Sequence, residues 1–386
     1  MSIMTKSKTP AKESDKAETL SDTPEQKFRT LSVISYFIVL VILGIPIWWY
    51  TTRVYRAALP LDDIYSLQIK PKTSKDFGLP LSLDYDVLIS FVHPSPETLN
   101  IKVDALEIDE YLQSFLEKLS LVSSFTVKSQ WLYLTELGAI PRKVLDHYAL
   151  LENQLPHVIT PLETKLWTHM SPRPSINLVT YFPHCTSPLY IYNSNNKMSS
   201  TNAFVSPRWG GIYIMNPDKS SCELGQFWAD SKLISSTFQS LLQELFHLNS
   251  TSQEALNIFQ LERIEEMLDS SKRTLISLAQ LLSEISSIVI SDMVANKISV
   301  ALESVKVAES FLAEGDERNA LQHAKLAFRN SEEAFVHPSL LALLYFPDDQ
   351  KYAIYIPLFL PVMIPVVMSL IHLAKKKGKT EKRKAE

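Results

Sequence analysis

Two long hydrophobic segments near the ends of the sequence place the strongest constraint on what this chain can fold into. Residues 31–50 read LSVISYFIVLVILGIPIWWY and residues 352–373 read YAIYIPLFLPVMIPVVMSLIHL, and neither contains Asp, Glu, Lys or Arg. As a helix that rises about 1.5 Å per residue, each segment is long enough to cross a hydrocarbon core of about 30 Å. The sequence therefore predicts two single transmembrane helices that flank one large region.

Basic residues predict the orientation of these two helices. Several lysines and one arginine follow the second segment, whereas only Lys351 lies close before it. They are Lys375, Lys376, Lys377, Lys379, Lys382, Arg383 and Lys384. Because basic residues beside a transmembrane helix stay on the cytosolic side, we expect the C-terminus in the cytosol. Two spans then place the N-terminus there as well, and residues 51–351 in the lumen of a eukaryotic secretory membrane.

A cleaved signal peptide is the alternative interpretation of the first segment. Its apolar run is longer than that of a signal peptide, a polar stretch precedes it, and no small-x-small cleavage site follows Trp48, Trp49 and Tyr50. An uncleaved signal anchor fits these features better. The three aromatic residues suit membrane positioning at the interface, although packing on the luminal region is the alternative for them.

The predicted topology divides the charge of the chain unevenly. The chain has 38 basic and 42 acidic residues, and the two tails hold 13 of the basic and seven of the acidic ones. This leaves 25 basic and 35 acidic residues between the hydrophobic segments. Such an acidic excess argues against nucleic-acid binding, which needs a concentrated basic surface. The basic C-terminal tail could touch anionic lipid, but we expect it to act mainly as a topological signal.

Two features of the predicted luminal region concern covalent modification. Cys185 and Cys222 are the two cysteines of the chain, and in an oxidising compartment they either form a disulfide or remain two buried thiols. Asn249 begins the sequence Asn-Ser-Thr, which is the one glycosylation sequon between the hydrophobic segments. We expect Asn249 to be glycosylated if this region is luminal.

The first part of the predicted luminal region has the pattern of an α/β fold. Candidate strands are rich in Val, Ile, Tyr and Phe and are bounded by Pro, Asn or Ser. They span residues 84–92, 125–134, 176–182, 189–193 and 212–216. A helical pattern at residues 108–119 lies between the first two strands, and strands that alternate with helices favour an α/β layer.

The character of the sequence changes near Gly225. Residues 226–335 include one Gly and no Pro. Steps of three and four between apolar residues from Leu261 to Val289 predict one long amphipathic helix or two nearly collinear ones. Further helices are predicted from about residue 292 to 313, ending at Gly315, and from Asp316 to about residue 335. We interpret the apolar stripe as the core of a bundle; a docking surface for a partner is the alternative.

The predicted fold is thus an α/β luminal domain plus a long-helix bundle, flanked by two single transmembrane helices. Its parts are a disordered cytosolic tail at residues 1–27, a transmembrane helix at 31–50, the α/β domain at 51–225, the bundle at 226–336, a second transmembrane helix at 352–373 and a basic cytosolic tail at 374–386. The first tail is predicted to be disordered because it has almost no large apolar side chains.

A search for catalytic patterns finds no strong one. The chain has no G-x-S-x-G, H-E-x-x-H or C-x-x-C sequence and no phosphate-binding glycine loop. The nearest suggestion is Cys185 beside His184, with His157 and His169 upstream, but a cysteine nucleophile needs a base within reach and a group that orients the base. We therefore expect no catalytic, cofactor-binding or metal-binding residues. A membrane-tethered luminal cysteine hydrolase that acts independently is the alternative.

Three prolines distinguish the second hydrophobic segment. Pro357, Pro361 and Pro365 recur every fourth residue, so they lie roughly on one face of a helix. Each removes one backbone N–H and crowds the carbonyl four residues earlier. In hydrocarbon, the carbonyls left without partners need another helix, a hydroxyl group or water. We expect this face to contact other subunits or lipid; a simply kinked anchor is the alternative.

The last residues of the chain place Lys384 and Lys382 near the C-terminus, in the sequence KRKAE. On a cytosolic tail, this spacing resembles the dilysine retrieval signal of endoplasmic-reticulum membrane proteins. A receptor reads such a signal as an address. The topology predicted from the hydrophobic segments puts it on the required side of the membrane.

Several stretches together resemble the PIG-S family, whose members are subunits of the glycosylphosphatidylinositol (GPI) transamidase complex. They are residues 48–60 (WWYTTRVYRAALP), 206–211 (SPRWGG), 278–290 (LAQLLSEISSIVI) and 340–361 (LLALLYFPDDQKYAIYIPLFLP). Their order and spacing match across most of the chain from residue 30 to 373. The chain is short for the family, and the deficit falls in the α/β part.

The resemblance implies a role in an endoplasmic-reticulum complex that removes a C-terminal signal from a precursor protein and joins the new end to the ethanolamine of a preassembled glycolipid. In this family the peptide-cleaving cysteine belongs to another subunit, PIG-K, so no catalytic residue is carried over. The resemblance thus implies a non-catalytic structural subunit, with PIG-K among its partners and GPI lipid and precursor protein as further possible contacts. A self-contained cargo receptor would instead function without transamidase subunits.

Overall fold

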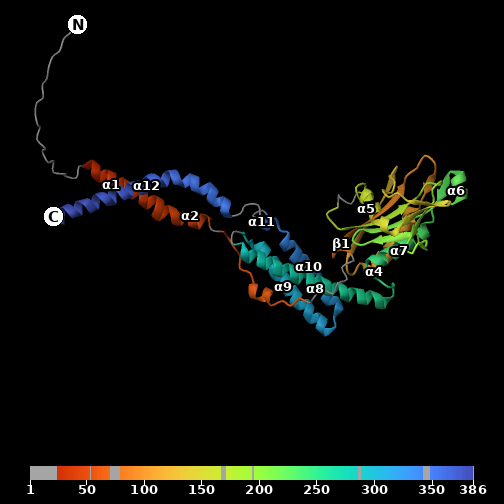
Figure 1. Cartoon of the computed structure of the whole chain (residues 1–386). Coiled ribbons are helices and arrows are strands. Elements are labelled where there is room, and N and C mark those ends of the chain that lie inside the picture. Colours follow the sequence, from red (N-terminus) through yellow and green to blue (C-terminus); the bar gives the residue numbers. More distant parts are fainter. Residues whose placement is uncertain are drawn as a thin grey trace, which may run out of the picture. The chain divides into compact units, whose positions relative to one another are not determined.

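The structure is a computed structural model that describes residues 24–52, 54–69, 79–166, 171–193, 195–285, 288–341 and 348–385. The chain divides into two compact units (Figure 1). One unit comprises the terminal segments, Met1–Arg56 and Pro338–Glu386, together with Ser286–Ser291. The other unit comprises Ala57–Ile285 and Asp292–His337 and holds every strand of the described chain.

A five-stranded sheet forms the centre of the second unit, with strand order β3-β1-β6-β9-β8. The strands are β1 (Asp84–His93), β3 (Ser124–Tyr133), β6 (Ser175–Tyr181), β8 (Ala203–Ser206) and β9 (Gly210–Ile214). The first four in spatial order run parallel, and β8 pairs antiparallel with β9. The strands predicted at residues 84–92, 125–134, 176–182 and 212–216 are confirmed within a few residues, while β8 was not predicted.

Each face of this sheet packs against its own hydrophobic core. One face carries Val87 and Phe91 of β1 and is covered by α4 (Ala105–Leu119) and α7 (Ser231–Leu245). The opposite face carries Leu88 and Val92 of β1 and is covered by α5 (Leu155–Glu163). A second sheet, ordered β4-β5-β7, adds to the α5 side. Its strands are β4 (Arg142–Val144), β5 (His147–Leu151) and β7 (Leu189–Tyr192).

The helical part of this unit consists of α8 (Gln253–Glu284), α9 (Asp292–Glu314) and α10 (Glu317–Phe335). The predicted end at Gly315 is confirmed, because this glycine has a φ of 80° and Asp316 caps α10 through the Asn319 N–H. Fully buried alanines lie where α9 and α10 pack, and their small side chains let the helices approach closely. They are Ala301, Ala308, Ala320, Ala324, Ala327 and Ala334.

The predicted long helix ends earlier than expected. We predicted helical structure through Val289, but α8 ends at Glu284, so the last stretch of that prediction is wrong. The chain just after this stretch makes an extended contact, in which the Ile290 N–H donates to the Tyr55 carbonyl at 3.1 Å. At its other end, α8 contributes Phe259, Met267 and neighbouring residues to the core beneath α4 and α7, so bundle and sheet share one core.

Several elements of three to six residues were not predicted, because so few residues carry little periodicity. They are α3 (Leu61–Tyr65), β2 (Asn100–Lys102), the 3-10 turn Glu152–Gln154, α6 (Lys219–Leu224), β10 (Gln226–Trp228) and α11 (Pro338–Leu341). The strands β2 and β10 pair in parallel, which places a strand at the beginning of the stretch that we expected to be helical throughout.

The first unit contains the two apolar helical segments. The N-terminal segment runs through α1 (Pro24–Phe37), a π-helical stretch, η1 (Ile38–Gly44), and α2 (Ile45–Thr52) without a break. The C-terminal segment is the single helix α12 (Asp348–Ala385). Most of the tail predicted to be disordered lies outside the described residues, and its last four residues begin α1.

Candidate functional site

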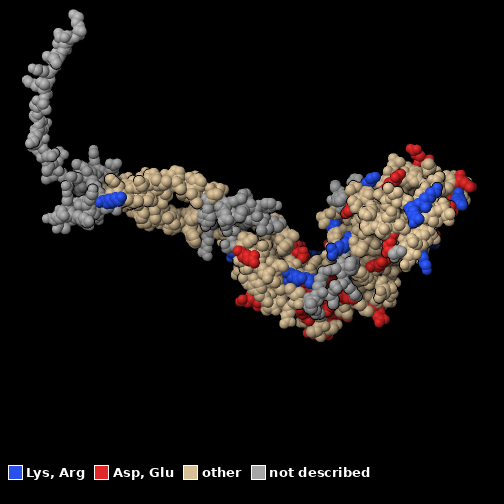
Figure 2. Space-filling model, viewed as in Figure 1, with Lys and Arg blue, Asp and Glu red and all other residues tan. Residues whose placement is uncertain are grey.

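The two terminal helical segments are the first candidate for function. Residues Thr30–Tyr50 and Ala353–His372 have mean hydropathies of 2.4 and 2.3, and neither window is buried inside the protein. Figure 2 shows this region as a surface almost without charged side chains. By length and composition, both helices can cross a membrane.

One face of each segment turns toward the other segment. The less exposed positions of the first segment recur at helical spacing, at residues 30, 33, 37, 40, 41, 44 and 48. The last of these, Trp48, meets Tyr355 of α12 edge-on with ring centroids 6.2 Å apart. Trp49 and Tyr50 point away from this contact and are 69% and 82% exposed. The structure therefore separates the predicted aromatic group into one packed residue and two outward-facing residues.

The three prolines lie on the outer side of α12. Pro357, Pro361 and Pro365 are all exposed, whereas the positions that are less exposed are Tyr355, Met363, Val366, Ser369 and Leu370. The first segment therefore does not cover the proline face. This face is available to lipid or to another protein, and its predicted role in contact with either stays a prediction.

The π-helical stretch η1 in the first segment was missed by sequence reasoning. It comprises Ile38–Gly44. Like the proline-containing part of α12, it departs from regular α-helical hydrogen bonding. Stretches of π-helix inside α-helices occur often at functional sites. The run IVLVILG carries no local signal for it other than the terminal Gly44.

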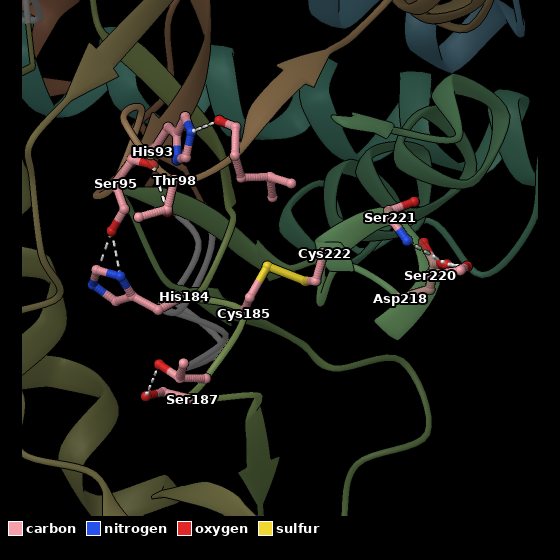
Figure 3. Close-up of a disulfide and its surroundings, with 12 residues drawn as sticks. His93, Ser95, Thr98, His184, Cys185, Ser187, Asp218, Ser220, Ser221 and Cys222 are labelled. Atoms are coloured by element: carbon pink, nitrogen blue, oxygen red, sulfur yellow. Dashed lines mark hydrogen bonds between the residues drawn. A yellow bond between two sulfur atoms is a disulfide. The ribbon is translucent and has the colours of Figure 1, made fainter. Parts of the chain in front are cut away.

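The carboxyl ends of β1 and β6 are the second candidate. From β1 the chain continues through α4 to β3, which pairs on one side of β1, whereas β6 pairs on the other side. The connections that follow β1 and β6 therefore leave in opposite directions. Ligands of open α/β sheets bind in the crevice at such a switch point. Here His93 ends β1, Ser95 follows it, and His184 and Cys185 follow β6 (Figure 3).

Two histidines and a serine meet at this switch point. The Oγ atom of Ser95 shares a hydrogen bond with Nδ1 of His184, and the Nε2 atom of the same ring is 3.4 Å away. His93 donates from Nε2 to the Leu99 carbonyl at 2.8 Å, and its Nδ1 has no hydrogen-bond partner among the described residues. Burial, and the neighbouring His184, lower the pKa of His93, despite the opposing effect of its bond to Leu99. The lowered pKa favours the neutral form of His93, whose Nε2–H is held by the Leu99 carbonyl.

Cys185 is joined to Cys222 by a disulfide. Asp218 caps α6 by accepting the Ser221 N–H at 3.1 Å, and this helix presents Cys222 to the loop after β6 (Figure 3). A cysteine nucleophile must be a free thiolate, so the disulfide removes the group on which the hydrolase interpretation depends. Of the other histidines named for that interpretation, His157 is exposed on α5, and His169 lies outside the described residues.

The remaining predicted sites are separate from this cluster. Asn249 is exposed in the connection between α7 and α8. Lys382 and Lys384 fall in the last turns of α12. In the parts of the chain that the structure describes, no three His, Cys, Asp or Glu side chains lie together as metal ligands would.

Comparisons with known proteins give one consistent result. A family model described as "Phosphatidylinositol-glycan biosynthesis class S protein" (PIG-S) matches residues 35–82 and 68–380. A curated relative from Rattus norvegicus named "GPI-anchor transamidase component PIGS" is 38% identical over 81% of this chain and 61% of its own length. The relative of the same name from Homo sapiens is 38% identical over 76% of this chain and 57% of its own length. A Saccharomyces cerevisiae relative, "GPI transamidase component GPI17", is 23% identical over 72% of this chain.

The chain spans about three fifths of the length of the curated relatives that it matches. The two matches to the family model overlap at residues 68–82.

Proposed function

This chain belongs to the PIG-S family, and on that premise we propose that it is a non-catalytic structural subunit of the GPI transamidase complex. The complex attaches preassembled GPI anchors to the C-terminus of precursor proteins in the endoplasmic reticulum. The observation that carries the proposal is the match to relatives named as GPI transamidase components, which extends over most of this chain.

The disulfide supports the non-catalytic part of the proposal. Since Cys185 is bonded to Cys222, the described chain has no free cysteine with which to cleave a peptide bond. The Ser95–His184 pair lacks a third group that orients the histidine, because no carboxylate bonds to that ring in the described structure. The cysteine that cuts the precursor would then belong to another subunit, for which we propose PIG-K.

We further propose that the two apolar helices cross the endoplasmic-reticulum membrane as a pair. Their contact through Trp48 and Tyr355 supports an antiparallel arrangement, with both termini in the cytosol and the sheet unit in the lumen. Lys382 and Lys384 would serve as the retrieval signal. Asn249, which is exposed, would be glycosylated in the lumen. The exposed face with Pro357, Pro361 and Pro365 would contact other subunits or GPI lipid.

Native purification tests the proposed function. The full chain, tagged on its C-terminal tail ahead of Lys382, is purified from cells in a mild detergent, and the recovered proteins are identified by mass spectrometry. We expect the other transamidase subunits, with PIG-K among them, in stoichiometric amounts. Recovery of a folded chain without these subunits would contradict the proposal and favour a self-contained protein.

A further inference from the structure

The proline face of α12 carries the most exposed large apolar side chains described in that helix. Ile354, Leu358 and Met368 are 66%, 66% and 64% exposed. At 3.6 residues per turn, all three lie within about 60° of Pro361 around the helix axis. The less exposed Val366 lies on the other side of the helix, about 140° from Pro361. The proline face is thus the side of α12 that is turned furthest from the first segment.

Three backbone carbonyls on this side of α12 lack their usual partners. Because Pro357, Pro361 and Pro365 have no N–H, the helical hydrogen bonds to the carbonyls of Ala353, Pro357 and Pro361 cannot form. α12 keeps the α-helical pattern from Asp348 to Ala385, so no 3-10 or π turn at the prolines offers these carbonyls another N–H. The three carbonyls recur every fourth residue and therefore form one row.

The position of this row in the span keeps it away from water. If Ala353–His372 crosses the membrane, Pro361 lies eight residues from the first residue of the span, or about 12 Å at 1.5 Å per residue. That depth is near the middle of a hydrocarbon core of about 30 Å. Backbone groups at this depth need a partner in another helix, a hydroxyl group or a bound water molecule.

The described chain supplies no such partner on the proline face. Between residues 353 and 368, the one side chain with a hydrogen-bond donor is Tyr355. Its ring meets Trp48 on the inner face, where the first segment packs. Lipid acyl chains have no donors either. The row of carbonyls therefore calls for donors from another molecule that reaches the middle of the membrane.

We propose that the proline face of α12 binds a transmembrane helix of another transamidase subunit, and that this helix carries Ser, Thr, Asn or Gln at successive fourth positions. The inference rests on the proposed function, because the complex supplies the helix. Such side chains hydrogen-bond between helices in membranes. Residues four apart on one helix lie on the same face, so their donors match the spacing of the carbonyls of Ala353, Pro357 and Pro361.

A second copy of this chain does not meet the requirement through the same face. In a two-fold pairing, both helices would present the prolines together with Ile354, Leu358 and Met368, none of which has a side-chain donor. The carbonyls of both copies would then stay without partners in hydrocarbon, which is costly. The partner helix therefore belongs to a different polypeptide.

A photo-crosslinker on the proline face tests the inference in the intact complex. The full chain carries p-benzoylphenylalanine at Leu358, or at Ile356 as the control, and is purified with its partners and irradiated. Ile356 has almost the same depth and is 55% exposed, but it lies about 160° from Leu358 around the helix. We expect a crosslink from residue 358 to a transmembrane helix of another subunit at least about fivefold above that from residue 356. Mass spectrometry of the crosslinked peptide should show the donor residues at fourth positions.

A pair of alanine variants gives a second measurement. Pro361→Ala restores an N–H for the Pro357 carbonyl, so this carbonyl no longer needs the partner. Ile364→Ala, about 60° away on the same side of α12, also shortens a side chain but changes no backbone donor. We expect Pro361→Ala to lower partner recovery at least about threefold relative to Ile364→Ala.

The outcomes separate this inference from the proposed function. Crosslinks from residue 358 only to lipid, only to a second copy, or to a helix without such donors would overturn the inference, and so would equal recovery of the two alanine variants. The proposed function would stand in each case if the other subunits are recovered. If Pro361→Ala fails to insert, the crosslink alone decides. Failure of the wild-type chain to recover any transamidase subunit would overturn the proposed function and the inference with it.

Discussion

In the sheet unit, Phe91 and Phe238 are fully buried, whereas in the terminal helix pair Phe359 is 47% exposed and most apolar residues face outward. The sheet unit thus obtains its stability from contacts within the chain. The helix pair has one inner face, marked by Trp48 and Tyr355, and leaves the rest of its apolar surface to its surroundings. The difference indicates that changes in the first region should alter folding, and changes in the second should alter association.

The same substitution in both regions is the strongest test of this difference. Phe238→Ala leaves a cavity between α7 and the sheet and should lower the free energy of unfolding by about 3–5 kcal/mol. Phe359→Ala removes a side chain of α12 that is already 47% exposed, and it should lower the free energy of unfolding by only about 1 kcal/mol. Urea unfolding of the full chain in mild detergent, followed by near-ultraviolet circular dichroism, measures both. Equal losses would contradict the comparison.

The disulfide should have the next largest effect. Cys185 and Cys222 are 37 residues apart in sequence, and loss of a crosslink that closes a loop of this length costs about 3–4 kcal/mol. Cys185→Ser and Cys222→Ser should therefore destabilise the sheet unit equally. Transamidation in cells should fall only as far as the amount of folded protein falls. A loss of activity specific to Cys185→Ser, at equal protein level, would instead support a cysteine hydrolase.

Replacement of the three outer prolines should affect association and leave folding intact. Pro357→Leu, Pro361→Leu and Pro365→Leu together restore the missing backbone donors of α12 and change the shape of its outer face. We expect normal membrane insertion and a several-fold lower recovery of partner subunits. This decrease corresponds to a loss of about 1 kcal/mol in the free energy of association. A matched triple change on the inner face, at Met363, Val366 and Leu370 to Ala, should disturb the helix pair itself. Unchanged recovery from the proline variant would show that these residues only shape an anchor.

The smallest expected effect concerns acid stability. The pKa of His93 is lowered by burial and by the nearby His184, so the unfolded chain binds a proton at a higher pH than the folded protein. Stability should therefore fall as the pH drops below the ordinary histidine pKa of about 6.5. His93→Gln should show a smaller loss of unfolding free energy between pH 7 and pH 5 than the wild type. If the unfolding free energies of the two proteins fall in parallel with pH, His93 is not the source of the acid sensitivity.

Long periodic elements could be predicted from the sequence. The strands of the main sheet other than β8, the helix α4 and the bundle helices α9 and α10 follow from their apolar spacing and caps. The end of α8 could not be predicted, because Ile285 and Val289 continue the helical pattern although Ile290 bonds to Tyr55. A tertiary contact thus overrides the local pattern there.

The candidate sites were predictable to different degrees. Proline spacing indicated one face of α12, but only the structure shows that this face is opposite to the one that holds Tyr355. The proximity of Ser95 and His184 depends on the order of β1 and β6 in the sheet, which the local sequence does not specify.

The most direct test of the central claim is complementation with a variant that lacks the Ser95–His184 pair at the switch point. In cells without their own PIG-S protein, the Ser95→Ala, His184→Ala double variant is compared with the wild type for subunit recovery and for GPI-anchored protein at the cell surface. We predict equal surface levels once both are normalised to assembled complex. Full assembly without GPI-anchored protein at the surface would contradict a non-catalytic role for this subunit.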